Sequence, residues 1–181
     1  MLKPQDIVVT LRLLLAESRA EPTSYAHLSS WTGVSASEAH AAIRRAVTVG
    51  LVATALKDTG TGFGWTVARG PLEEFVSYAI RYLWPLEQGP EQRGVPTGWA
   101  VNGFNTGPNS VQEASPWVWK SAMGTIRGTE TKPLYRTVPE AAVKDPVFHQ
   151  ALAAIDLARA PNQRLRRLGV EWLQSNVLRK A

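Results

Sequence analysis

Residues 24–50, SYAHLSSWTGVSASEAHAAIRRAVTVG, decide the fold of this chain. Ser24 and Ser35 each precede a short apolar pattern, and a serine in that position caps a helix by accepting a hydrogen bond from a first-turn backbone N–H. Glu38, three residues after Ser35, completes the sequence pattern of a capping box, and Gly33 is typical of a helix end. The segment therefore predicts two short helices joined by a tight turn, which is a helix-turn-helix unit.

The second helix of this unit is predicted to start after Ser35 and to reach about Val49, with Gly50 closing it. Helical spacing assigns its apolar residues to the buried side: Ala39, Ala42, Ile43, Ala46 and Val47. The side that faces away from the core is then predicted to carry Ser37, His40, Ala41, Arg44 and Thr48.

The flanking segments add a helix before the unit and a hairpin after it. Pro4 suits the first turn of a helix, and Ile7, Leu11, Leu14 and Leu15 then form one apolar face. Residues 51–57 and 65–69 are β-compatible, and the glycine-rich turn at 58–64 between them predicts a β-hairpin. Helix, helix-turn-helix and hairpin is the order of elements in a winged helix.

The rest of the chain, residues 76–181, predicts further helices. The cleanest amphipathic pattern covers residues 72–84 and stops before Pro85, and two more helices are expected after Asp145-Pro146 and after Pro161-Asn162. Residues 86–138, rich in proline, glycine and tryptophan, lose this pattern and predict an irregular or short-strand segment laid on the helical core. The expected fold is mainly α with a small β-hairpin wing, formed by a winged helix-turn-helix domain at 1–75 and a C-terminal helical region at 76–181 with an irregular Trp-rich segment.

Residues 3–75 resemble the helix-turn-helix of bacterial winged-helix transcriptional regulators. The resemblance lies in Tyr25, Leu28, the Gly33-Val34-Ser35 turn, Ser37-Glu38, His40, Ala42-Ile43-Arg44-Arg45 and Gly50-Leu51-Val52. It implies that the second helix lies in the major groove of DNA, with its N-terminal half against the base edges. The implied DNA-binding residues are Ser35, Ser37, His40, Ala41, Arg44, Arg45, Thr48 and, from the hairpin, Lys57. A solvated helix face, with Glu38 serving only as a cap, is the alternative.

Composition excludes several classes of protein. Hydrophobic residues make up 44% and charged residues 19% of the 181, which is the balance of a globular chain. The absence of cysteine excludes a disulfide scaffold, a zinc-thiolate site and a thiol nucleophile. The apolar run from Leu13 to Ala16 is too short for a signal peptide or a membrane span, so a cytoplasmic protein without a membrane partner is expected.

No catalytic motif stands out. The three histidines have no metal-ligand spacing, and the glycine-rich turn lacks the spacing and the lysine of a phosphate-binding loop. The paired tryptophans at 117 and 119 predict core or partner contacts, with stacking on bases as the sharper alternative. We therefore expect no enzyme, no cofactor and no metal site.

The formal net charge of +5 permits nucleic acid as a partner, but its distribution is uneven. Residues 1–75 hold equal numbers of basic and acidic side chains, so the excess lies beyond them. Its densest part is the end of the chain: Arg159, Arg164, Arg166, Arg167, Arg179 and Lys180, against Glu171 alone. These residues suit a solvated face, contact with DNA flanks, or docking of an acidic protein through Arg164, Arg166 and Arg167.

Two functions from different classes fit these observations. The first is a non-enzymatic, sequence-specific regulator of transcription that binds double-stranded DNA, acting as a repressor and as a homodimer on a pseudo-palindromic operator. The second is a protein-binding module, such as an antitoxin or an accessory subunit of a bacterial defence or toxin system. The neutral charge of residues 1–75 favours the second, and the outward set on the second helix favours the first.

Overall fold

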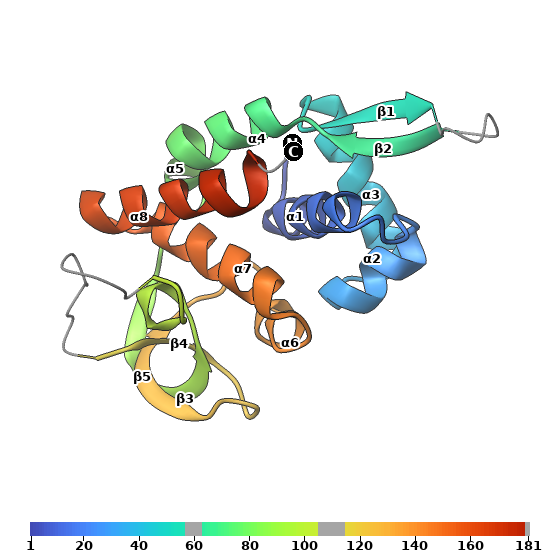
Figure 1. The fold of residues 1–181 in the computed structure, drawn as a ribbon. Helices are drawn as coiled ribbons and strands as arrows, with labels where there is room; N and C mark the ends of the chain where they lie inside the picture. The colour runs from blue at the N-terminus through green and yellow to red at the C-terminus, as the bar shows by residue number, and fades with distance from the viewer. Residues whose placement is uncertain (57–62, 105–114, 180–181) are drawn as a thin grey trace.

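The computed structural model describes residues 1–56, 63–104 and 115–179. The protein is mostly helical, as predicted, with a two-stranded antiparallel sheet and a separate three-stranded sheet at opposite ends of the molecule (Figure 1). The first five elements are α1 (Pro4–Ser18), α2 (Tyr25–Thr32), α3 (Ala36–Thr48), β1 (Val52–Leu56) and β2 (Phe63–Val67).

The predicted helix boundaries in this part are confirmed. Ser24 caps α2 by accepting a hydrogen bond from the His27 backbone N–H at 3.3 Å. Gly33 ends α2 in the left-handed conformation, with φ of 70°, which a residue with a Cβ rarely adopts. Helix α1 is buried on all sides from Gln5 to Ala16 and so forms the centre of the core, more than the single apolar face that its spacing predicted.

The hairpin differs from the prediction in its second strand. Val52 pairs with Val67 and Leu56 with Phe63, so β2 begins two residues before the predicted strand and ends before Arg69. Arg69 instead begins a helix, because Pro71 fits a first helical turn, where its missing N–H needs no partner. Residues 57–62, which include Lys57 and most of the predicted glycine-rich turn, lie outside the described residues.

The rest of the chain forms these elements: helix α4 (Arg69–Glu74), π-helical turn η1 (Phe75–Ala79), α5 (Ile80–Leu83), β3 (Gln88–Pro96), 3-10 turn η2 (Gly98–Ala100), β4 (Trp117–Lys120), β5 (Ile126–Thr131), α6 (Val138–Ala142), α7 (Pro146–Arg159), α8 (Gln163–Leu173) and π-helical turn η3 (Gln174–Leu178). The helices expected after Asp145-Pro146 and after Pro161-Asn162 are confirmed, and the side chains of Asp145 and Asn162 cap them by accepting backbone N–H bonds from the first turn that follows.

The segments α4, η1 and α5 follow one another without a break, and we call this stretch, Arg69–Leu83, the long helix. Leu72, Val76 and Ile80 are buried as predicted. The apolar face predicted for residues 72–84 also includes Leu83, but this side chain is exposed. The π-helical turn explains the difference, because its wider turn shifts the residues that follow away from the 3.6-residue period.

The Trp-rich segment is more regular than predicted. Strand β3 pairs antiparallel with both β4 and β5, and β4 pairs parallel with β5, so the three strands close on themselves. Gly94 allows this closure, since a Cβ there would lie 2.1 Å from the carbonyl oxygen of Trp119. The pairing joins strands that are far apart in sequence and interrupted by glycine and proline, which is why no local pattern indicated it.

A buried carboxylate joins the three-stranded sheet to the helices. Asp156 on α7 accepts hydrogen bonds from Thr97 Oγ1 at 2.8 Å, from Trp119 Nε1 at 2.6 Å and from Arg159 Nη1 at 2.7 Å. Arg159 also donates from Nε to the Trp84 carbonyl, which holds the end of the long helix. In the sequence, Arg159 groups with the basic residues at the end of the chain, but its side chain is only 4% exposed.

The two predicted regions pack closely on one another. Thr137 donates its hydroxyl proton to the Thr32 carbonyl at 2.7 Å, next to the turn between α2 and α3. Arg19 forms an ion pair with Asp145, and Arg69 donates to the carbonyls of Val177 and Leu178. These bonds join the ends of α1 and α2 and the start of α4 to the C-terminal helical region.

The first prediction concerns the Asp156 site. Replacing Asp156 with Asn keeps the shape but leaves the buried Arg159 guanidinium without a counter-charge, so the free energy of unfolding should fall by about 3–5 kcal/mol. Glu87→Gln is the control, because Glu87 pairs with Lys132 in an exposed ion pair whose loss should cost about 1 kcal/mol or less. Urea unfolding followed by circular dichroism measures both, and equal small losses would contradict the assigned role.

Candidate nucleic-acid interface

Helix α3 has one buried side and one fully accessible side. Ala39, Ala42, Ile43 and Ala46 are completely buried against α1 and α2, as the spacing predicted. The opposite side exposes Ser35, Ser37, His40, Arg44 and Thr48, and Ala41 is half-buried beside them. Of the eight residues expected to contact DNA, the structure thus places five on one exposed face.

The start of α3 is built by the turn that precedes it. Ser35 Oγ accepts a hydrogen bond from the Glu38 backbone N–H at 3.2 Å, which confirms the predicted cap. The second half of the capping box is absent among the described contacts, because the Glu38 carboxylate turns toward α1 and accepts from Gln5 Nε2 at 2.9 Å. The buried Val34 and the hydrogen bond from the Val34 N–H to Thr32 Oγ1 fix the turn itself.

Arg45 is engaged in contacts within the protein. Its Nε and Nη2 donate to the two carboxylate oxygens of Asp6 at 2.8 and 2.6 Å, and Nη2 also lies 2.5 Å from Glu38 Oε1. Asp6 is completely buried. The hydrogen bond that Arg45 donates to Asp6 raises the pKa of Arg45 above its usual value, so its charge is fixed. This corrects the sequence-based assignment of Arg45 as a DNA-binding residue, because its guanidinium holds α3 on α1.

Arg44, the neighbouring residue, points the other way. It is exposed, and no ion pair with it is found among the described residues. Thr48 Oγ1 donates to the Arg44 backbone carbonyl at 3.0 Å, a contact that does not involve the guanidinium. Successive residues on a helix lie about 100° apart, so the buried contact of Arg45 determines that Arg44 faces solvent.

An aromatic row leads from α3 to the hairpin. The ring of His40 meets the ring of Tyr25 edge-on at 4.9 Å between centroids, and Tyr25 lies 6.3 Å from the ring of Trp65 on β2. A groove of about 500 Å³ runs beside this row, between the start of α2 and β2. The exposed face of α3, the start of α2 and the hairpin therefore form one continuous surface.

The hairpin is held in place by a carboxylate from α1. Glu17 accepts a hydrogen bond from the Val67 backbone N–H at 3.0 Å. Burial raises the pKa of Glu17, and the bond from Val67 partly opposes that shift. The position of β2 relative to α3 is thus set by the core, and Lys57, the residue predicted to contact DNA from this hairpin, lies outside the described residues.

The basic C-terminal helix carries less available charge than its sequence indicated. Arg166 is half-buried and donates to the carbonyls of Ala160 and Pro161 at the end of α7. Arg167 pairs with Glu171 at 2.7 Å, and Arg179 pairs with Glu73 on the long helix at 2.7 Å. Arg164 is exposed on the first turn of α8, and Lys180 is not described.

The tryptophans and histidines that the sequence suggested as other possible sites have structural roles. Trp117 and Trp119 are buried, which argues against stacking on nucleic-acid bases. His149 Nε2 lies 2.7 Å from the Pro96 carbonyl, and His27 lies beside Arg12 and Glu21. Within the described ranges, no three potential ligand side chains form a metal cluster. In the same ranges, the helices are too short or too polar to cross a membrane.

Comparison with known proteins gives no relative for this arrangement. No protein-family model matches the sequence, and searches among curated proteins and solved structures find no match either. The functional argument therefore rests on the geometry of the surface described above.

The two adjacent arginines give a matched test of the site's construction. Arg45→Ala leaves the buried Asp6 carboxylate unpaired and should lower the free energy of unfolding by about 3 kcal/mol. Arg44→Ala removes an exposed side chain and should change it by no more than about 0.5 kcal/mol. Urea titrations of both variants measure the difference, and equal stability of the two would show that the orientation of α3 is wrong.

Acid should weaken the contact of Glu38 with Gln5 and Arg45. Hydrogen bonds from Gln5 and then Arg45 lower the pKa of Glu38 from its ordinary value of 4.5. A carboxyl group of this kind adds stability above its unfolded-state pKa and loses that contribution as the pH falls through its folded-state pKa. Glu38→Gln should therefore lose less stability than the wild type below pH 4.5. Parallel stability profiles for the two proteins across this range would refute the contribution of Glu38.

Proposed function

We propose that this chain is a DNA-binding regulator of transcription whose helices α1–α3 and hairpin β1–β2 act as a winged helix-turn-helix. The observation that carries the proposal is the exposed face of α3, which presents polar and basic side chains beyond a capped turn and beside a hairpin. Among the described residues, this face lacks an acidic side chain, since Glu38 turns toward α1. Such a face suits the negatively charged duplex.

The proposed contacts follow from the order of residues along α3. Ser35 and Ser37 lie at the positive end of the helix, where hydroxyl and backbone N–H groups suit a phosphate oxygen. His40 and Arg44 lie one and two turns further along the same face, where they would reach base edges in the major groove. Ala41, half-buried between them, suits a thymine methyl group.

The start of α2 and strand β2 would flank the duplex. Tyr25 connects His40 to Trp65, so the aromatic row fixes the distance between the inserted helix and the hairpin. This contact would position the protein on the backbone, and the side chains of α3 would supply the sequence preference. The regulator would act in the cytoplasm, as a repressor when its site overlaps a promoter.

A protein-binding module is the second candidate, and one observation favours it. The described α3 face presents Arg44 as its one unpaired positive charge, because Arg45 forms an ion pair with the buried Asp6. The surface is thus weakly basic and would also suit a protein partner. Docking of an acidic protein through Arg164, Arg166 and Arg167 has less support, since Arg166 and Arg167 already have partners within the chain.

Arg44→Ala is the direct test of the proposal. The duplex for this test is one that the wild-type protein enriches from a random-sequence pool. If Arg44 reads a guanine, the variant should bind this selected duplex about 5- to 150-fold more weakly, which corresponds to about 1–3 kcal/mol. Its preference at one base pair should also be relaxed. Arg167→Ala on α8 is the matched control, because it removes an exposed arginine far from α3 along the chain. Fluorescence anisotropy with selected and scrambled duplexes gives both affinities.

The same measurement separates the two candidates. If the wild-type protein binds selected and scrambled duplexes equally, or if Arg44→Ala binds as tightly as the wild type, α3 does not read DNA. Equal losses of duplex affinity for Arg44→Ala and Arg167→Ala would show that each arginine contributes only general electrostatic attraction. That result would also overturn the assignment of Arg44.

A further inference from the structure

One region of the surface is unusually apolar. Three of the large hydrophobic side chains that are exposed in the described chain, Tyr78, Tyr82 and Leu83, lie on the long helix. A fourth, Val49, lies across a groove from that helix. Exposed apolar side chains are ordinary when scattered, but a cluster of them indicates a surface that another molecule covers.

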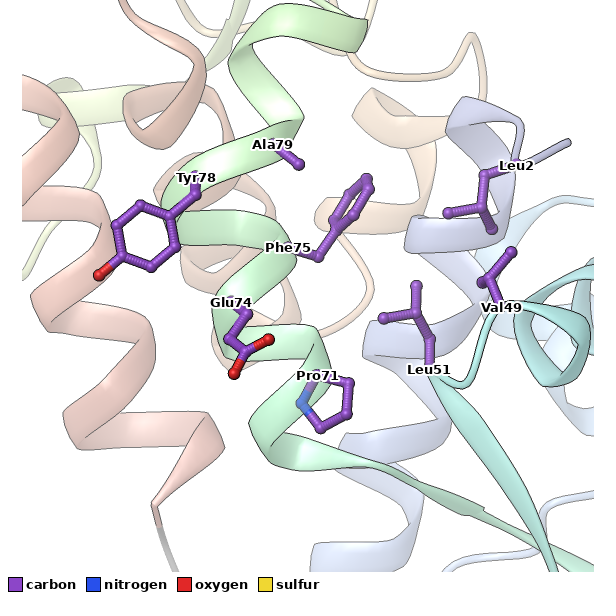
Figure 2. Close-up of a pocket in the computed structure, with 8 residues that line it drawn as sticks. All are labelled: Leu2, Val49, Leu51, Pro71, Glu74, Phe75, Tyr78 and Ala79. Carbon is purple, nitrogen blue, oxygen red and sulfur yellow. The ribbon is translucent and has the colours of Figure 1, made fainter.

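The groove itself has a volume of about 510 Å³ and separates the long helix from the connection between α3 and β1. Figure 2 shows the ring of Phe75 extending from the helix toward the opposite wall, which Leu2, Val49 and Leu51 form. Glu74 and Tyr78 lie on the same helix as Phe75, and the Tyr78 ring points away from the opposite wall (Figure 2). The floor is therefore apolar, and Glu74 is the one charged side chain in the lining.

We infer that a second copy of this chain covers this face, with its own long helix lying antiparallel across the first. The charges on the helix support that occupant. Glu74 is exposed and has no ion-pair partner among the described residues, and Arg81 lies seven positions further along. Seven residues correspond to a rise of about 10.5 Å, which is too far for Glu74 and Arg81 of one chain to pair directly.

Two-fold symmetry brings these groups together. If the axis passes beside Tyr78, position 74 of one helix lies opposite position 82 of the other, next to Arg81. The Arg81 guanidinium already donates from Nη2 to the Tyr82 hydroxyl at 2.6 Å and stacks over its ring at 4.6 Å. Glu74 of the second copy would therefore meet a preformed Arg81–Tyr82 pair, and the same contact would recur on the other side of the axis.

The apolar residues follow the same symmetry. Tyr78 lies at the centre, where a large aromatic side chain contributes most to an interface, and the charged pairs lie at its two ends. Because Val49 and Leu51 follow α3 directly, this interface would adjoin the C-terminal end of α3 in both copies. This inference deepens the proposed function. Only the role of the dimer rests on that function, since the dimer would present two α3 helices to two DNA half-sites.

Sedimentation equilibrium on the full chain, without DNA, tests the inference. The wild type should be a dimer that dissociates on dilution. Tyr78→Glu places two carboxylates together at the axis and should raise the dimer dissociation constant at least about 30-fold. Tyr78 is 72% exposed, so the variant should fold normally, as circular dichroism will show. Met123→Glu is the control, because Met123 is also exposed but lies between β4 and β5, and it should leave the dimer unchanged.

A charge exchange tests the proposed antiparallel arrangement. Glu74→Arg and Arg81→Glu should each weaken the dimer about tenfold, because each brings like charges together across the axis. The double variant restores opposite charges and should recover most of the wild-type affinity. Recovery in the double variant is not expected if the second copy binds in another orientation.

The outcomes separate this inference from the proposed function. A wild-type chain that stays monomeric at all concentrations, or a dimer that Tyr78→Glu leaves intact, overturns the inference and leaves the groove to a different protein or a small apolar ligand. Failure of the charge exchange overturns the antiparallel arrangement. Arg44→Ala should remain dimeric, so a loss of DNA binding in that variant reports on α3 alone.

Discussion

The ion pair between Asp6 and Arg45 determines what the N-terminal surface can present. Asp6 lies in the first turn of α1, the most deeply buried helix, and accepts two hydrogen bonds from one guanidinium on α3. A bidentate contact of this kind fixes both the distance and the rotation of α3. The rotation in turn places Arg44, His40 and Ser37 on the outside, so the proposed interface is a consequence of a buried contact.

The free energy of that pair is less informative than its geometry. Removing Asp6 from water costs several kcal/mol, and the attraction to Arg45 largely offsets that cost, so the intact pair adds little net stability compared with apolar residues. Its contribution is specificity, because other rotations of α3 would leave the buried Asp6 carboxylate unpaired. The Asp156 site in the C-terminal half has the same character, since it fixes the sheet formed by β3, β4 and β5 on α7.

The features that could be predicted from the sequence are those set by neighbouring residues. Ser24, Gly33 and Ser35 act within one helical turn, so the helix boundaries and the exposed face of α3 were predicted correctly. Contacts across long sequence separations were not. Arg45 looked equivalent to Arg44 because its partner Asp6 lies 39 residues away, and Arg159 looked like surface charge because the carbonyls of Trp84 and Lys132 that it contacts are distant in sequence. A spacing signal existed for Arg45, which follows Ala42 and Glu38 by three and seven positions and so lies nearer the buried side.

The central claim is that the exposed face of α3 reads double-stranded DNA, and site-specific photo-crosslinking tests it most directly. A photoreactive amino acid would replace Ser37 on α3 in one protein and Arg167 on α8 in another, and each would be irradiated with duplexes enriched from a random-sequence pool by the wild type. The account predicts enrichment of a defined sequence and crosslinks to bases from position 37 but not from position 167. No enrichment, or crosslinks from position 167 alone, would contradict it.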